Sequence, residues 1–153
     1  MDLNAYLLAE KQYLIKIANA INKPEDVKRL QAEYTSLIDR VRNQFFDEES
    51  GWFYDTSLDG KSHIKVKGCE GWTPLWANIA TKEQAEAVKN TMMSPEFNTT
   101  IPFQTLTSAH PNYKPHRGYW RGPNWLDQAY FGIQGLRNYG YESEAYTAAR
   151  KLI

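Results

Sequence analysis

The sequence has little cysteine and no long apolar run. Cys69 is the only cysteine among 153 residues, so an internal disulfide is excluded. No nucleophile motif surrounds Cys69, and a small buried thiol is therefore the better interpretation. No stretch reaches the roughly 18 consecutive apolar residues that suggest a transmembrane helix. These two absences exclude a disulfide scaffold and a membrane-spanning chain.

The sequence also has no excess of either charge. Lysine and arginine total 18, and aspartate and glutamate also total 18. A nucleic-acid or anionic-membrane partner would favour a basic surface, so neither is expected. The first residues, MDLNAYLLAEKQ, lack the basic region and apolar core of a signal peptide. This fits a cytoplasmic chain, and equally a periplasmic or secreted parent whose leader precedes these residues.

Metal-ligand patterns are missing as well. His63, His110 and His116 do not have the spacing of a zinc site. The segment DEESG at residues 47–51 departs from a calcium-binding loop at several positions and is better explained as a turn. We therefore expect neither a metal nor a cofactor.

Helical periodicity dominates the first third of the chain. Residues 3–21 place apolar side chains at steps of three, four or seven, and residues 25–46 continue in steps of three and four. Pro24, between the two stretches, suits the first turn of a helix. The pattern predicts two long amphipathic helices packed as an antiparallel pair.

The remaining segments alternate between short helices and long loops. Residues 51–68 have an Asp-Gly turn signal and alternating Ile64 and Val66, which predicts an inserted β-hairpin. Thr81 and Gln84 form a capping box before a helix at 82–93. The segment 94–118 is an ordered loop with four prolines. Further helices are expected at 125–138 and from 142 to the end of the chain.

This order of elements predicts the fold class. Helix, turn, helix and elaborated loop is the organisation of an α/α toroid, whose loops gather at one rim. We therefore predict a mainly α fold, a partial (α/α)6 toroid of helical hairpins with a small inserted β-hairpin. Residues 1–153 are expected to form a single domain.

The first candidate site is the segment GCEGWTPLW at residues 68–76. A tryptophan ring can stack on a pyranose while a carboxylate accepts hydrogen bonds from its hydroxyls, which gives Glu70 and Trp72 a role in sugar binding. The alternative is that Trp72 and Trp76 belong to the core and that Glu70 caps a helix.

The second candidate site crowds aromatic rings around an arginine at residues 119–125. Arg121 could hold sugar hydroxyls or orient a catalytic carboxylate through its rigid fork of donors. Alternatively, Arg121 pairs with Asp127 and the tryptophans pack beneath the rim. Both interpretations can hold together.

Three blocks of the sequence together resemble glycoside hydrolase family 63, in particular its bacterial α-glucosidase-like members. The blocks are EGWTPLWANIATKEQAEAV, EFNTTIPFQTLT and YWRGPNWLDQAYFGIQGLRNYGY. The first block is shared more loosely with trehalases. The resemblance implies an (α/α)6 barrel that hydrolyses α-linked gluco-oligosaccharides with inversion. It also implies that the sugar pocket is lined by Glu70, Trp72, Tyr119, Trp120, Arg121 and Trp125.

The resemblance also implies that part of the enzyme is missing. Inversion requires an acid and a base whose carboxyl groups lie roughly 6.5–9.5 Å apart. The family's acid and base segments have no counterpart here, so the catalytic residues remain unassigned. We expect an internal fragment of a catalytic barrel, inactive alone. The alternative is a free-standing α-helical module that binds carbohydrate or protein. A fragment that stands alone would expose the apolar walls of its first and last helices, so a homo-oligomer, most simply a dimer, is predicted.

Overall fold

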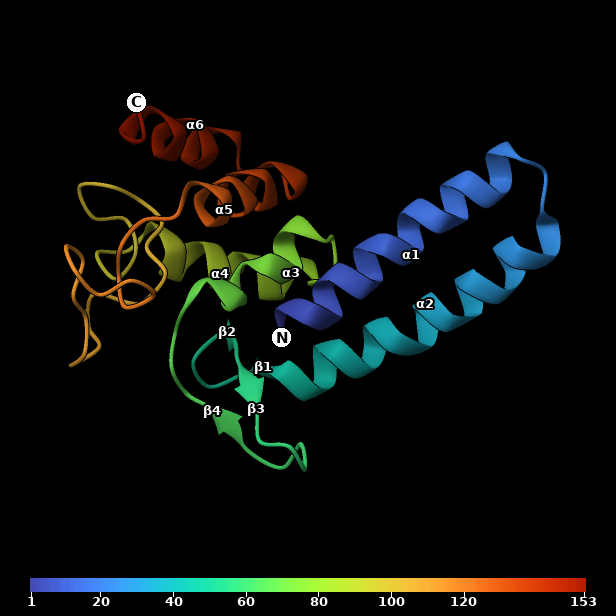
Figure 1. Cartoon of the computed structure of the whole chain (residues 1–153), viewed down its shortest axis with the longest axis horizontal. Helices are drawn as coiled ribbons and strands as arrows, with labels where there is room; N and C mark the ends of the chain where they lie inside the picture. The colour runs from blue at the N-terminus through green and yellow to red at the C-terminus, as the bar shows by residue number, and fades with distance from the viewer.

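The computed structural model describes all residues, 1–153, and begins with the expected helical hairpin (Figure 1). Helix α1 (Asp2–Ala20) and helix α2 (Pro24–Phe45) lie side by side. Pro24 occupies the first turn of α2, where its missing amide hydrogen leaves no partner unsatisfied. Asn22 turns the chain with a positive φ of 54°. The antiparallel helix pair predicted from periodicity is confirmed.

The apolar side chains of α1 divide between two faces. Leu8 is fully buried, and Ile38 and Val41 of α2 belong to the same core. A second set on α1 is exposed by 40–69 % and comprises Leu3, Leu7, Leu14, Ile17 and Ile21. The far half of the hairpin extends away from the rest of the molecule in Figure 1. The open wall expected on the first helix is therefore present, and the dimer that would cover it stays a prediction.

Two short antiparallel strand pairs follow the hairpin. Strand β1 (Phe46–Asp47) pairs with β2 (Trp52–Phe53), which periodicity did not predict. Strand β3 (Asp55–Thr56) pairs with β4 (His63–Ile64) and confirms the inserted β-hairpin.

The apolar alternation that predicted the hairpin does not match the two faces of β4. Ile64 is 51 % exposed, whereas the His63 side chain turns toward the body of the molecule. His63 Nε2 lies 3.0 Å from the Gln44 carbonyl oxygen, and Nδ1 lies 3.6 Å from an Asp47 carboxyl oxygen. These polar contacts with the end of α2 and with β1 determine which face of the strand turns inward.

The centre of the molecule is built from short helices. The 3₁₀ turn η1 (Cys69–Gly71) leads into α3 (Thr73–Trp76), and α4 (Lys82–Met93) follows. The predicted capping box of α4 is confirmed, because Thr81 and Gln84 each accept a hydrogen bond from the other's backbone amide. Cys69 is buried, as expected.

Helix α5 (Leu126–Asn138) and helix α6 (Glu142–Lys151) complete the fold. The expectation of an uncovered apolar wall on the last helix is wrong. Ala145 and Ala148 are fully buried, because this face of α6 belongs to the same core as α5. None of the helices is both long enough and apolar enough to cross a membrane.

The long connection between α4 and α5 is pinned to the body by polar side chains. Lys67 Nζ lies 3.1 Å from Glu96 Oε1, and Thr107 donates to Glu96 Oε2 at 2.9 Å. The Thr107 amide also donates to the Lys67 carbonyl at 3.0 Å. The loop that the sequence predicted to be ordered is thus held against residues 67–69.

Close packing of α5 on α3 makes a testable prediction at Gly135. A Cβ built there would lie 2.9 Å from Leu75 Cβ and 3.0 Å from the Trp76 amide nitrogen. Alanine in a helix is intrinsically more stable than glycine by about 1 kcal/mol. We nevertheless expect Gly135→Ala to lower the free energy of unfolding by about 1–3 kcal/mol, because the overpacking involves backbone. Urea denaturation measures the change, and a stabilised variant would contradict this packing.

Candidate functional site

An exposed aromatic cluster lies just before helix α5. It consists of Tyr119, Trp120 and Trp125, and the ring of Trp125 lies between the other two. The ring centroid of Trp125 is 5.1 Å from that of Tyr119 and 5.2 Å from that of Trp120. Tyr119 is 74 % exposed and Trp120 is 43 % exposed. The cluster therefore presents ring surface to solvent in a fixed arrangement.

Backbone geometry fixes the rings. Tyr119 has a positive φ of 54°, an uncommon conformation for an aromatic residue. The Trp125 indole nitrogen donates a hydrogen bond of 3.2 Å to the Tyr119 carbonyl. This contact closes the turn and orients both rings.

The buried hydroxyl of Thr105 anchors the same segment. Its oxygen lies 3.1 Å from the Trp120 carbonyl oxygen and 3.0 Å from that of Pro123, and it accepts a bond of 3.3 Å from the Gly122 amide. One hydroxyl proton serves one carbonyl at a time, so the two carbonyls compete for it. Thr105 thus ties residues 120–123 to the long loop.

Thr105 also adjoins the turn that carries Glu70. Leu106 forms an isolated antiparallel bridge with Gly68, and a Cβ at Gly68 would come within 2.9 Å of the Thr105 carbonyl oxygen. Glu70 Oε1 accepts a hydrogen bond of 2.8 Å from the Gly68 amide. The structure therefore brings the turn that carries Glu70 next to Thr105, which anchors the aromatic cluster about 50 residues further along the sequence.

Burial changes the chemistry of Glu70. Loss of solvent around the half-buried carboxyl raises its pKa from the ordinary 4.5 to about 8, against the lowering effect of backbone hydrogen bonds. At neutral pH the group is largely protonated, so it can donate a hydrogen bond as well as accept one.

Trp72 lies in the core, so the expectation that it lines the sugar pocket is wrong. Its side chain is fully buried, and its ring centroid lies 5.2 Å from that of Phe97 and 5.6 Å from that of Phe103. Its indole nitrogen donates a 3.0 Å bond to the Gln128 carbonyl in α5. The alternative interpretation of Trp72 as a core residue is the one that the structure supports, because no ring face is free for a ligand.

Arg121 and Asp127 are both exposed and do not form an ion pair. The Arg121 backbone is engaged, since its carbonyl accepts from the Lys114 amide at 2.6 Å and its amide donates to the Gly118 carbonyl. Its guanidinium has no carboxylate partner in the chain. The alternative interpretation, in which Arg121 pairs with Asp127, is therefore wrong, and the guanidinium donors are free for a ligand.

Sequence reasoning misses two polar anchors of the site. Thr105 lies within a matching block, but no local pattern gives a role to it or to Asn124. The Asn124 side-chain amide donates to the carbonyls of Pro102 and Phe103 at 2.6 and 3.1 Å. Both side chains are anchors because they bond to residues about 20 positions away in the sequence, and such contacts cannot be predicted from a local pattern. No three His, Cys, Asp or Glu side chains gather in a way that could hold a metal ion.

Comparison with known proteins identifies the family. The model of the mannosylglycerate hydrolase MGH1-like glycoside hydrolase domain matches residues 1–153. The chain belongs to this glycoside hydrolase family. The resemblance to glycoside hydrolase family 63 is thereby confirmed. Mannosylglycerate hydrolase of Rubrobacter radiotolerans is 27 % identical over 146 residues, which cover 93 % of this chain and 32 % of that protein.

Trehalases are also similar to the chain. Cytosolic neutral trehalase of Saccharomyces cerevisiae is 30 % identical over 107 residues, 67 % of this chain and 14 % of that enzyme. The narrower expectation of an α-glucosidase-like member is not supported, because these relatives are mannosylglycerate hydrolases and trehalases.

A solved structure defines the fold. The mannosylglycerate hydrolase of Thermus thermophilus in complex with glucose, a member of glycoside hydrolase family 63, superimposes with a TM-score of 0.86 at 22 % identity. The match covers 97 % of this chain and 36 % of that one. The fold is thus a part of an (α/α)6 barrel, as predicted, and the chain spans about a third of the length of the mannosylglycerate hydrolases it matches.

The raised pKa of Glu70 predicts a pH-dependent stability. The folded state binds this proton more tightly than the unfolded state, so the stabilisation is complete below about pH 4.5 and is lost as the pH rises to about 8. Glu70→Gln removes the ionisable group, and with it the loss of stability at high pH. As the pH is raised from 5 to 8.5, the free energy of unfolding of the variant should increase by about 2–4 kcal/mol relative to that of wild type, since one pKa unit corresponds to about 1.4 kcal/mol.

Urea denaturation at the two pH values checks this prediction, with Glu83→Gln as the matched control. Glu83 is an exposed carboxylate whose pKa is lowered by backbone hydrogen bonds at the start of α4. Its replacement should give no comparable gain at the higher pH. Equal pH dependence in Glu70→Gln and wild type would refute the buried, protonated carboxyl.

Proposed function

We propose that this chain supplies part of the sugar-binding rim of a glycoside hydrolase that acts on a small glycoside. The observation that carries the proposal is the exposed cluster of Tyr119, Trp120 and Trp125, anchored by Thr105, which also lies beside the turn that carries Glu70. Ring faces stack on the apolar face of a pyranose, and the carboxyl and the free Arg121 guanidinium bind hydroxyls.

The similar proteins support a small substrate. They are named for mannosylglycerate and for trehalose, and one structure of the T. thermophilus enzyme is in complex with Tris and D-glycerate. Each of these compounds is small, with one sugar unit joined either to glycerate or to a second sugar unit. We infer a substrate of this class, hydrolysed with inversion, in place of a longer gluco-oligosaccharide.

Arg121 suits the polar group of such a substrate. Its guanidinium has no carboxylate partner within the chain, so it can pair with a carboxylate on the ligand or with a catalytic carboxylate from another segment of the barrel. A lysine presents a point charge and lacks the paired donors. Either role therefore requires arginine.

Sugar binding is testable on the chain itself. Titration with glucose, trehalose and mannosylglycerate should change tryptophan fluorescence, because Trp120 is partly exposed in the proposed site. We expect Trp120→Ala to weaken binding by about five- to a hundredfold, taking as a guide the roughly 1–3 kcal/mol that stacking of a nucleobase on an aromatic side chain contributes.

Tyr146→Ala is the matched control, since Tyr146 is 61 % exposed on α6 and outside the cluster. It should leave affinity unchanged. Arg121→Lys should weaken binding nearly as much as Arg121→Ala. A flat titration of folded protein to high millimolar sugar would refute a preformed subsite.

The chain is expected to bind without catalysis. Inverting hydrolysis requires an acid and a base on opposite sides of the scissile bond. The family resemblance implies that the segments that supply them have no counterpart in residues 1–153. Incubation with nitrophenyl α-glucoside or mannosylglycerate should therefore release no sugar above background. Turnover that disappears in Glu70→Gln would instead give Glu70 a catalytic role and contradict the proposed division of labour.

A further inference from the structure

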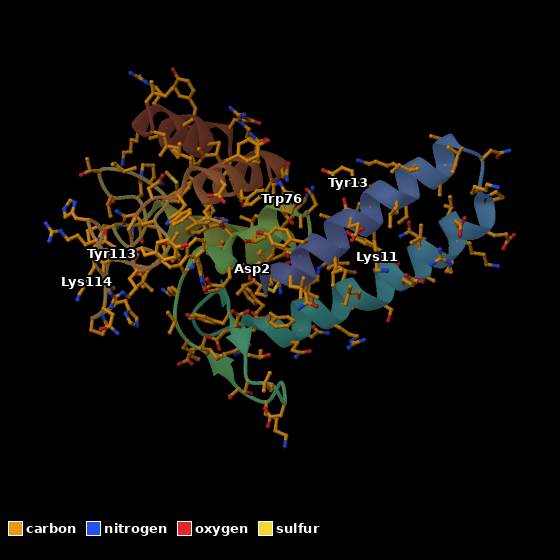
Figure 2. The ribbon with its side chains drawn as sticks, in the orientation of Figure 1. Asp2, Lys11, Tyr13, Trp76, Tyr113 and Lys114 are labelled. Carbon is orange, nitrogen blue, oxygen red and sulfur yellow. The ribbon has the colours of Figure 1, made fainter.

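The connection between α4 and α5 carries charge of one sign only. Residues 97–126 contain three of the chain's 18 lysines and arginines and none of its 18 acidic residues. The three are Lys114, Arg117 and Arg121, and residues 114–121 are here called the basic turn. Figure 2 shows Lys114 at the end of the molecule opposite the α1–α2 hairpin. The net charge of zero for the whole chain therefore hides a local concentration of positive charge.

Backbone hydrogen bonds fix the shape of the basic turn. The Lys114 amide donates to the Arg121 carbonyl at 2.6 Å, and the Lys114 carbonyl accepts from the Gly118 amide at 2.8 Å. The Arg121 amide donates to the Gly118 carbonyl at 3.0 Å. A Cβ at Gly118 would lie 2.4 Å from the Lys114 carbonyl oxygen, so the chain closes tightly around this buried glycine. Lys114 and Arg121 are thus held as neighbours.

The basic turn has engaged its acceptors and kept its donors. The carbonyls of residues 114 and 118–121 all lie within hydrogen-bond distance of a donor. The amides of residues 116, 117, 119 and 120 form no hydrogen bond within the chain. Successive free amides in a turn are a typical backbone setting for an anion, and the left-handed conformation of Tyr119, with a φ of 54°, is part of such turns.

The protein neutralises none of the three cations. Lys114, Arg117 and Arg121 are all exposed, and none lies within ion-pair distance of a carboxylate. By contrast, Lys67, which holds the same connection against the body, is paired with Glu96 at 3.1 Å. Like charges on one closed turn repel one another, and a bound anion would relieve that repulsion.

The number of charges favours a phosphoryl group over a carboxylate. A carboxylate has one charge and two oxygens, which the Arg121 fork alone can satisfy. A phosphate monoester carries about −1.5 to −2 charges at pH 7 and three strong acceptor oxygens, which match Arg121 together with Lys114 and Arg117. A nucleic acid fits less well, because all 18 acidic residues lie on the rest of the chain and would repel an extended polyanion.

We propose that the basic turn binds the phosphoryl group of a phosphorylated glycoside whose sugar lies on the aromatic cluster. The inference rests on the proposed function, because Tyr119 and Trp120 belong to both the cluster and the turn. Arg121 stands between the two parts of the ligand, and Lys114 and Arg117 supply the further positive charge. Mannosylglycerate and trehalose carry no phosphate, so this substrate differs from those for which the relatives are named.

The test compares four probes by isothermal titration calorimetry on the folded chain at neutral pH and low ionic strength. The probes are glucose, glucuronate, glucose 6-phosphate and inorganic phosphate. Glucose 6-phosphate should bind at least about tenfold more tightly than each of the other three, because it alone combines a sugar ring with a doubly charged group. Inorganic phosphate or glucose that binds as tightly as glucose 6-phosphate would overturn the proposal.

Substitutions assign the effect to the turn. The double variant Lys114→Gln/Arg117→Gln should bind glucose 6-phosphate no more tightly than glucose. The matched control is Lys28→Gln/Arg40→Gln, which removes two equally exposed and unpaired charges from α2 and should bind glucose 6-phosphate as wild type does. An equal loss of affinity in both variants would mean a general effect of net charge and would refute the site.

The same titrations distinguish a failure of this inference from a failure of the proposed function. If glucose binds and glucose 6-phosphate binds no more tightly, the phosphoryl site is refuted and the sugar-binding rim stands. If glucose does not bind and inorganic phosphate binds as tightly as glucose 6-phosphate, the rim is refuted. The turn would then be a site for free phosphate, and the phosphorylated glycoside would be excluded with the rim.

Discussion

The site depends on the burial of Trp72. This ring sits between the turn that carries Glu70 and the start of α5, and its indole hydrogen bond to the Gln128 carbonyl joins the two segments at 3.0 Å. Burying a tryptophan contributes several kcal/mol through its area alone, on the order of 25 cal/mol per Å² of apolar surface. Glu70 and Trp125 are each only a few residues from this anchor, so the same contact that stabilises the core positions both sides of the rim.

The rings around Trp72 pack so closely that they restrict which residues fit beside them. Trp52 stacks on Phe97 with centroids 5.2 Å apart, and a Cβ at Gly71 would lie 2.0 Å from the Trp52 ring. The Trp52 indole nitrogen is buried without a partner, which opposes folding by about 1–3 kcal/mol. Because the rings of this core pack so tightly, the exposed rings of the aromatic cluster lie outside it, in a turn fixed by the Thr105 hydroxyl.

The sequence predicted the helices well and the site only in part, for a physical reason. Helices α1, α2 and α4 repeat apolar residues at helical spacing and carry local start signals such as Pro24 and the Thr81–Gln84 capping box, so their existence is decided within a few turns of chain. The roles of Trp72 and Trp120 are not decided locally. Both follow a glycine-punctuated segment with charged neighbours, and only their packing partners, distant in sequence, bury one ring and expose the other. The burial of Ala145 and Ala148 on the last helix escaped prediction in the same way, because it depends on which helix lies beneath them.

The long loop shows how one segment can present two different chemistries. On one side of Gly122, exposed rings and a free guanidinium offer stacking and positive charge. On the other side lies a polar pocket lined by Thr99, Gln104, Tyr113 and Asn124. Gly122 has a φ of 119°, a conformation that residues with a side chain rarely adopt, and the Tyr113 ring packs where a Cβ would stand. Gly122 itself lines the pocket, while the residues just before it carry the aromatic cluster, so the two features meet at this glycine. Any bulkier residue at position 122 would have to displace the Tyr113 ring, which lines the pocket together with Gln104.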